Sequence, residues 1–159
     1  MESWVPERVV YTTKDTVVFN TESLFHYYMD KDYREYVNCV DMILIDGIGL
    51  KLVLLLFGCR VKRYNGPDFL KDTLQNTPMP IYIFGGPKNR ATPKCGEIKV
   101  ELPFSENCLL LANKIAAYIN QNIKSECLIV LSLGLPKQEK TALLLRKNYP
   151  KQKIKILPV

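Results

Sequence analysis

The chain has 159 residues, of which 47% are hydrophobic and 24% charged, with a formal net charge of +6. We expect a single domain over residues 1–159, because a chain of this length buries a core without a metal or disulfide staple. The composition excludes a disordered chain. The positive charge favours an anionic partner such as nucleic acid, a phosphorylated small molecule or an acidic membrane surface.

The cysteines indicate a reducing compartment. Five are scattered along the chain without a CxxC pair: Cys39, Cys59, Cys95, Cys108 and Cys127. This pattern favours reduced thiols over a disulfide framework or a zinc site, which predicts a cytoplasmic protein. The N-terminus shows no basic region followed by an apolar run, and the longest apolar run, residues 52–57, is far too short to span a membrane.

Strand-like and helical patterns alternate along the whole chain. Strands are predicted over residues 16–19, 40–45, 80–84, 98–102, 127–133 and 154–157. Helices are predicted over about residues 20–37 and 50–57, and from Pro67, Ser105 and Pro136 onward, with Gly58 closing the second helix. This alternation predicts an α/β fold: a single Rossmann-like domain of three layers with a mostly parallel sheet.

The hexapeptide Leu44-Ile45-Asp46-Gly47-Ile48-Gly49 places a carboxylate and two glycines where an apolar strand ends and a helix begins. In open α/β sheets, ligands bind outside the carboxyl ends of the strands, and a helix start offers free N–H groups to an anion. Gly47 and Gly49 allow a ligand to approach the backbone closely. The alternative is that Asp46 only caps the helix and the glycines only form a turn.

Three other strand ends also carry glycine or polar residues: Asn20, Gly85-Gly86 and residues 134–138. Parallel strands end at a common edge, so these groups and Asp46 together favour a ligand crevice. The GxGxxG and GxxxxGK[ST] fingerprints are absent, which argues against a dinucleotide-binding dehydrogenase and a P-loop NTPase. We expect no bound metal ion, because no paired carboxylates suited to a nucleotide diphosphate follow these strands.

Four motifs follow one another in a characteristic order. They are Asp46-Gly47-Ile48-Gly49, Arg63-Tyr64-Asn65-Gly66-Pro67-Asp68, Ile83-Phe84-Gly85-Gly86 and Leu133-Gly134-Leu135-Pro136-Lys137-Gln138-Glu139. In this order the motifs resemble the WecG/TagA/CpsF family of bacterial glycosyltransferases, over about residues 16–159. The Gly-x-Pro-Lys-Gln-Glu element is the most specific of the four.

The resemblance implies transfer of an N-acetylmannosamine-type sugar from a UDP donor to a polyprenyl-diphosphate-linked acceptor, with inversion and without a metal. UDP-sugar is then a substrate, and no cofactor is expected. The resemblance places the catalytic base at Asp46, a sugar-contacting glutamine at Gln138 and, approximately, an arginine near the donor diphosphate at Arg63. The other expected substrate-binding residues are Asn20, Gly47, Gly49, Gly85, Gly86, Gly134, Pro136 and Glu139. The expected location is the cytoplasm, peripherally on the inner face of the cell membrane, in cell-surface polysaccharide synthesis.

Two departures from the family pattern support a different class of function. Val18 stands where the family has a threonine two residues before the asparagine, and the family continues past the last strand into a basic, membrane-binding appendage. The alternative is therefore a truncated or non-catalytic member that binds nucleotide sugar or assists a partner glycosyltransferase. Self-association into a homo-oligomer is also expected. A third hypothesis, which rests only on charge, is a basic nucleic-acid-binding α/β domain. No nucleic-acid partner is expected, because a nucleic-acid-binding protein more often interleaves basic residues with exposed aromatic ones. The C-terminal basic cluster is instead interpreted as a solvated face: Arg146, Lys147, Lys151, Lys153 and Lys155.

Overall fold

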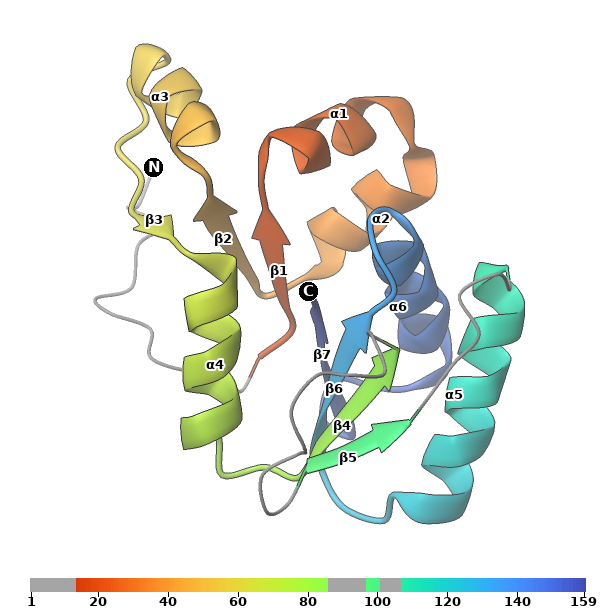
Figure 1. The fold of residues 1–159 in the computed structure, drawn as a ribbon. Helices are drawn as coiled ribbons and strands as arrows, with labels where there is room; N and C mark the ends of the chain where they lie inside the picture. Colours follow the sequence, from red (N-terminus) through yellow and green to blue (C-terminus); the bar gives the residue numbers. More distant parts are fainter. Residues whose placement is uncertain (1–13, 86–96, 101–106) are drawn as a thin grey trace.

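The computed structural model of the chain describes residues 14–85, 97–100 and 107–159, which form seven strands and six helices (Figure 1). The strands are β1 (Thr16–Phe19), β2 (Met42–Asp46), β3 (Arg63–Tyr64), β4 (Ile81–Gly85), β5 (Glu97–Val100), β6 (Cys127–Ser132) and β7 (Ile154–Pro158). The helices are α1 (Thr21–Met29), α2 (Lys31–Cys39), α3 (Ile48–Leu56), α4 (Gly66–Asn76), α5 (Cys108–Asn122) and α6 (Lys137–Asn148). Gly86 and Ser105 lie outside the described residues.

The strands form two parallel sheets, in the orders β1-β2-β3 and β5-β4-β6-β7. β1 lies beside β7, so the two sheets adjoin (Figure 1). The buried carboxylate of Asp15 bridges this junction, because its Oδ1 accepts the Ile156 N–H at 2.9 Å. The strands of the two sheets run in the same general direction in Figure 1, so their carboxyl ends lie along one side of the molecule.

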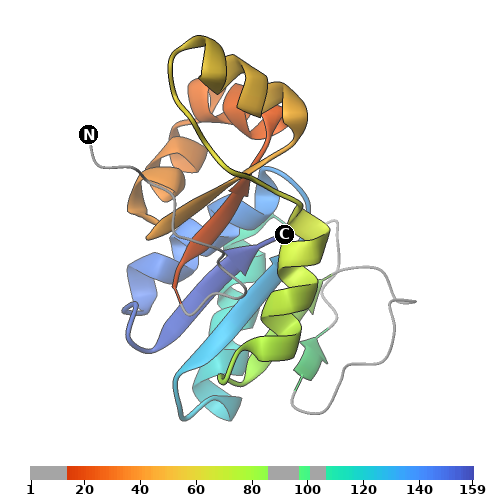
Figure 2. The same ribbon diagram turned by 90° about the vertical axis from the view of Figure 1, so that its left-hand side faces the viewer.

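Helices cover both faces of the sheets, which confirms the predicted three-layer α/β fold. On one face, α2, α5 and α6 pack against the strands through a core that includes Tyr36, Ile115 and Ala142. On the other face, α4 packs through Phe69 against a core that includes Leu128. Figure 2 shows α4 in front of the strands. The alternating apolar patterns are the cause, since each element must bury its apolar face against another layer.

The first predicted helix is wrong in one respect, because two helices occupy residues 21–39. Asp30 interrupts the run with an extended backbone and separates α1 from α2. Its Oδ1 accepts the N–H groups of Asp32 and Tyr33 at 3.0 and 3.1 Å, which caps α2. Aspartate satisfies free N–H groups of a helix start in this way, and it favours the break over a continuous helix.

Several predicted helix boundaries also shift by one or two residues. Asn107, and not Ser105, caps α5 by accepting the Leu110 N–H at 2.9 Å. Pro136 is the residue before α6 and not its first residue, and α4 begins at Gly66, one residue before Pro67. α3 begins at Ile48, two residues earlier than predicted.

The predicted glycine closure of α3 is confirmed. Gly58 has a φ of +78°, in the left-handed region that favours glycine. Its N–H donates to the Leu55 carbonyl, and the Cys59 N–H donates to the Leu54 carbonyl, both at 2.9 Å. This paired arrangement is the Schellman motif, which satisfies carbonyls at the end of a helix.

Candidate functional site

Asp46 is the last residue of β2, and two backbone N–H groups hold its carboxylate. The Gly47 N–H donates to Oδ1 at 2.7 Å, and the Gly66 N–H donates to Oδ2 at 3.3 Å. The first contact is within the turn, but the second comes from the start of α4, twenty residues further along the chain. Asp46 is not a simple cap of α3, because the residue at the cap position is Gly47 and no side chain caps that helix.

Three helices begin around this carboxylate. α1 follows β1 through Asn20, α3 follows β2 through Gly47, and α4 begins at Gly66. A Cβ added to Gly49 would lie 3.5 Å from Thr21 Oγ1, so the first turns of α3 and α1 are neighbours. Helix starts carry free N–H groups and the positive end of the helix dipole. Their convergence gives this edge the properties of an anion site.

The backbone at Gly47 is open to a ligand. Gly47 has a φ of +85°, a conformation in which any residue with a Cβ is strained. A Cβ built on Gly47 would have no heavy atom of the described residues within 4 Å. The conformation therefore requires glycine, and the space beside it is free for a bound molecule.

Val18 and Asp46 contact the same glycine at the start of α4. A Cβ added to Gly66 would lie 3.1 Å from Asp46 Oδ2 and 3.2 Å from Val18 Cγ1. The side chain of Val18 thus packs next to the carboxylate, on the neighbouring strand. Gly66 belongs to the Asn-Gly-Pro-Asp segment, which the sequence predicts as a turn before a helix and as part of the second family motif. Its contact with Asp46 was missed because the two residues are remote in sequence.

Asn20 and Arg63 lie on either side of Asp46 along the edge of the first sheet. Asn20 follows Phe19, which pairs with Ile45, and Ile45 also pairs with Arg63. The Asn20 side chain caps α1, because its Oδ1 accepts the Ser23 backbone N–H and the Ser23 hydroxyl at 2.9 and 3.1 Å. Arg63 is exposed. The Asn20 side chain therefore stabilises the start of α1, whereas the Arg63 side chain is accessible to a ligand.

The second sheet contributes glycines at the ends of β4 and β6. Gly85 pairs with Ser132, and a Cβ added to Gly85 would lie 2.5 Å from the Ser132 carbonyl oxygen, so no other residue fits there. Gly134 has a φ of +78° and precedes a cis peptide bond between Leu135 and Pro136. These residues shape the backbone that leads from β6 into α6.

The connection from β6 to α6 reaches the first sheet. Leu135 packs with Phe19 of β1, Tyr33 of α2 and Leu50 of α3 in one apolar cluster. Lys140 of α6 also forms an ion pair with Asp30, with 2.6 Å between Nζ and Oδ2. The start of α6 therefore lies against the elements that surround Asp46, and the predicted residues of both sheets belong to neighbouring parts of one edge.

Gln138 and Glu139, in the first turn of α6, are 5% and 1% exposed. Gln138 Nε2 donates to Glu139 Oε1 at 3.1 Å. The remaining oxygens, Gln138 Oε1 and Glu139 Oε2, are buried without a hydrogen-bond partner among the described residues. Burial raises the pKa of Glu139 to about 7, although the Gln138 amide favours the charged form. This buried polar pair was expected as part of an open crevice, and it lies instead beneath the surface.

Among residues 14–85, 97–100 and 107–159, no group of three or more potential side-chain ligands is arranged to hold a metal ion. The chain matches the model of the family described as Glycosyl transferase WecG/TagA/CpsF over residues 2–157. A comparison with curated proteins found no match. The family match covers all the described strands except the last residue of β7, and it includes every residue predicted for the site.

Proposed function

The chain belongs to the WecG/TagA/CpsF family of glycosyltransferases, and we propose that it transfers an N-acetylmannosamine-type sugar from a UDP donor to a polyprenyl-diphosphate-linked acceptor. The observation that carries this proposal is the carboxylate of Asp46, set at a strand end among the starts of α1, α3 and α4. A base and an anion site side by side are what transfer from a nucleotide diphosphate requires.

Asp46 takes the role of general base. Each carboxylate oxygen already accepts one backbone N–H, and these two contacts fix the orientation of the group. An ionised carboxylate has further lone pairs, so it can also accept the proton of the acceptor hydroxyl as that oxygen attacks the anomeric carbon. A direct attack of this kind inverts the configuration of the sugar.

The departing UDP gains negative charge as the glycosidic bond breaks. The helix starts around Asp46 and the guanidinium of Arg63, on the strand paired with β2, supply positive charge at this edge. These groups belong to the protein, and we therefore propose a reaction that needs no metal ion or other cofactor. Activity that survives a chelator would support this, and activity restored only by a divalent cation would contradict it.

The turn from β6 into α6 completes the site in this proposal. Gly85, Gly134 and Pro136 shape the backbone beside the donor, and Gln138 contacts the sugar. Glu139 positions Gln138, because its Oε1 accepts the Gln138 amide. Since Gln138 is buried in this structure, its contact with sugar requires the turn to move when the donor binds.

The test is the release of UDP from UDP-N-acetylmannosamine in the presence of a lipid-diphosphate acceptor. Asp46→Asn keeps the shape of the side chain and removes the base, so we expect turnover to fall by at least about a hundredfold. Asp68→Asn, an exposed aspartate in the first turn of α4, is the matched control and should retain activity. Equal turnover in Asp46→Asn and the unmodified chain would exclude Asp46 as the base.

A second candidate function is a family member that binds nucleotide sugar without turning it over. Val18 favours it, since a methyl group lies beside Asp46 where the family pattern has a hydroxyl. This alternative predicts that UDP-sugar raises the melting temperature while no UDP is released. Turnover by the purified chain at ordinary enzymatic rates would rule it out.

A further inference from the structure

α3 presents a large apolar surface to solvent. Its only buried residue is Leu50. The exposed apolar side chains of α3 and its C-terminal end are Ile48 (63% exposed), Leu52 (53%), Val53 (41%), Leu55 (50%), Leu56 (86%) and Phe57 (79%). In Figure 1, α3 stands at the upper left, away from the helices that cover the sheets. A soluble domain rarely leaves a contiguous apolar patch of this kind without a partner.

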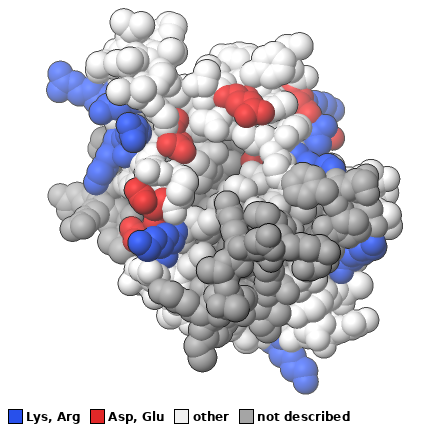
Figure 3. All heavy atoms as spheres, in the orientation of Figure 1, with Lys and Arg blue, Asp and Glu red and all other residues white. Residues whose placement is uncertain are grey.

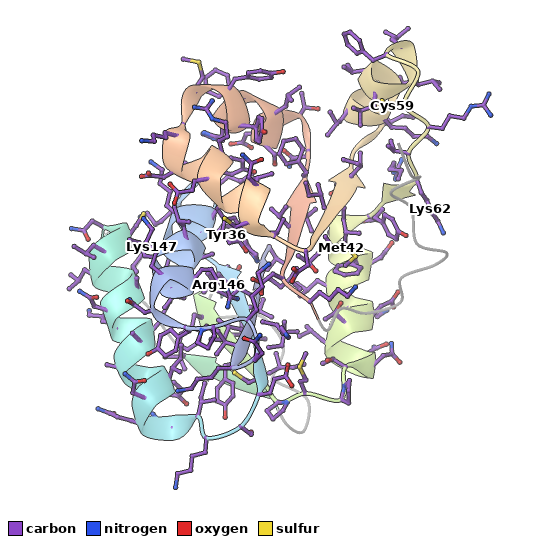
Figure 4. The ribbon with its side chains drawn as sticks, turned by 180° about the vertical axis from the view of Figure 1, so that it is seen from behind. Tyr36, Met42, Cys59, Lys62, Arg146 and Lys147 are labelled. Atoms are coloured by element: carbon purple, nitrogen blue, oxygen red, sulfur yellow. The ribbon has the colours of Figure 1, made fainter. Side chains whose placement is uncertain are left out.

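Basic residues lie beside this apolar surface. Residues 47–63 contain four lysines and arginines and no aspartate or glutamate: Lys51, Arg60, Lys62 and Arg63. All four are exposed. Figure 3 shows basic side chains gathered beside the uncharged tip of the molecule at the upper left, and Figure 4 shows Lys62 at the outer edge, next to the connection that leaves α3.

We propose that α3 and residues 57–63, together called the α3 surface, dock on a membrane that contains acidic lipids. The apolar side chains enter the interfacial region, while the lysines and arginines contact lipid phosphates. The charges select this partner, because four cations around the patch would repel the same four cations of a second copy and attract anionic headgroups. α3 has nine residues, and the about 14 Å that they rise is well short of the about 30 Å of a hydrocarbon core. Within the described residues, no helix combines the length and apolarity needed to cross a membrane.

The choice of a lipid surface as the partner rests on the proposed function, the transfer of a sugar to a lipid-linked acceptor. α3 begins two residues after Asp46, so a docked α3 would hold the carboxylate close to the headgroups. The diphosphate of a lipid-linked acceptor lies at that same level. Docking through the α3 surface would therefore bring the acceptor hydroxyl to the base without drawing the lipid chain out of the bilayer.

The test is co-sedimentation of the full chain with vesicles of phosphatidylcholine, with and without phosphatidylglycerol. We expect binding to the acidic vesicles only, and binding at least about tenfold weaker for the double variant Leu56→Ser, Phe57→Ser. The matched control is Leu109→Ser, Leu110→Ser, which removes two apolar residues of α5 that are 59% and 44% exposed. Lys62→Glu should weaken binding, and Lys124→Glu, an exposed lysine after α5, should not.

A spectroscopic measurement keeps the proposal falsifiable if a double variant folds poorly. The only tryptophan, Trp4, is replaced by phenylalanine, and Phe57→Trp then reports on the α3 surface. Acidic vesicles should shift its emission to shorter wavelength, and should not shift that of Leu109→Trp.

Absence of binding by the unmodified chain, or equal loss of binding in the α5 control, would overturn the proposal. The proposal would also be overturned if Leu56→Ser, Phe57→Ser dissociates an oligomer, as measured by light scattering, but binds vesicles as well as the unmodified chain does. Because no UDP-sugar is present, these outcomes are independent of sugar transfer.

Discussion

Val18 is the residue that most directly tests whether the site is complete. Its Cγ1 packs against the same glycine as Asp46 Oδ2, so a hydroxyl at this position would reach the site. Val18→Thr exchanges one methyl for a hydroxyl, and one added hydrogen bond to the sugar should raise kcat/KM by roughly three- to tenfold. The measurement is UDP release at low donor concentration. Val18→Ala, which loses the methyls and adds no hydroxyl, should show no gain, and equal rates in all three chains would contradict this role.

Glu139 predicts a dependence of stability on pH. Burial raises its pKa from 4.5 to about 7, so the folded chain holds this proton more tightly than the unfolded chain. The free energy of unfolding should therefore fall as the pH rises between these values, by roughly 3 kcal/mol at most.

Glu139→Gln removes this titration and keeps an oxygen that can accept the Gln138 amide. Relative to the unmodified chain, the variant should gain stability at about pH 8 and much less at about pH 5, as measured by urea unfolding. Glu126→Gln, an exposed glutamate before β6, is the control and should change little at either pH. A gain of the same size at both values would show that Glu139 does not titrate in this range.

The residues of the site differ in how far the sequence predicted them. Asp46 and Gly47 were predicted because their signal is local, a strand that runs into a glycine turn and a helix. The burial of Gln138 and Glu139 was not predicted, because a first helical turn with an acidic residue is usually solvent-exposed. What covers this turn is the packing of α2 against α6, which no local pattern encodes.

At the scale of elements, Asp30 is the residue that separates α1 from α2. It accepts two N–H groups of α2, and its Oδ2 lies 2.6 Å from Lys140 Nζ of α6. Asp30→Ala removes the cap and the ion pair together, and should lower the free energy of unfolding by about 1–2 kcal/mol. Lys140→Met removes the ion pair alone and should cost less than half of that. Urea unfolding measures both, and equal losses would mean that the cap contributes nothing.

The alternation of strands and helices was predictable because each element has its own apolar period. β3 was not predicted, since two residues, Arg63 and Tyr64, are too few to show a pattern. The exposure of α3 was not predicted either. Its composition is that of a core helix, and only the arrangement of its neighbours shows that most of its apolar residues face solvent.

At the scale of the whole molecule, the order of the strands depends on contacts between distant residues. Asp15 precedes β1, and its Oδ1 accepts the N–H of Ile156 in β7, 141 residues away. Pattern analysis predicted parallel strands, but it could not show that β1 and β7 are neighbours. That neighbourhood sets the ends of β1 and β2 beside the start of α6, and so brings the predicted site residues of the two sheets together.

Arg146 and Asp15 form the buried ion pair at this junction, with 2.7 Å between Nη2 and Oδ1, and side chains only 11% and 2% exposed. In Figure 4, Arg146 lies in the interior and Lys147 lies further out. Arg146→Met would leave a buried carboxylate without its cation, and should lower the free energy of unfolding by about 3–5 kcal/mol.

Two matched variants separate this buried charge from ordinary loss of a contact. Lys147→Met breaks the neighbouring exposed ion pair, in which Lys147 Nζ lies 3.9 Å from Glu35 Oε1. This variant should lower the free energy of unfolding by no more than about 1 kcal/mol. Adding Asp15→Asn to Arg146→Met removes the stranded charge but keeps an oxygen for the Ile156 N–H, so part of the stability should return. Urea unfolding of the three variants is the measurement. If Arg146→Met costs no more than Lys147→Met, the junction of the two sheets does not depend on this pair, and apolar packing between β1 and β7 holds it.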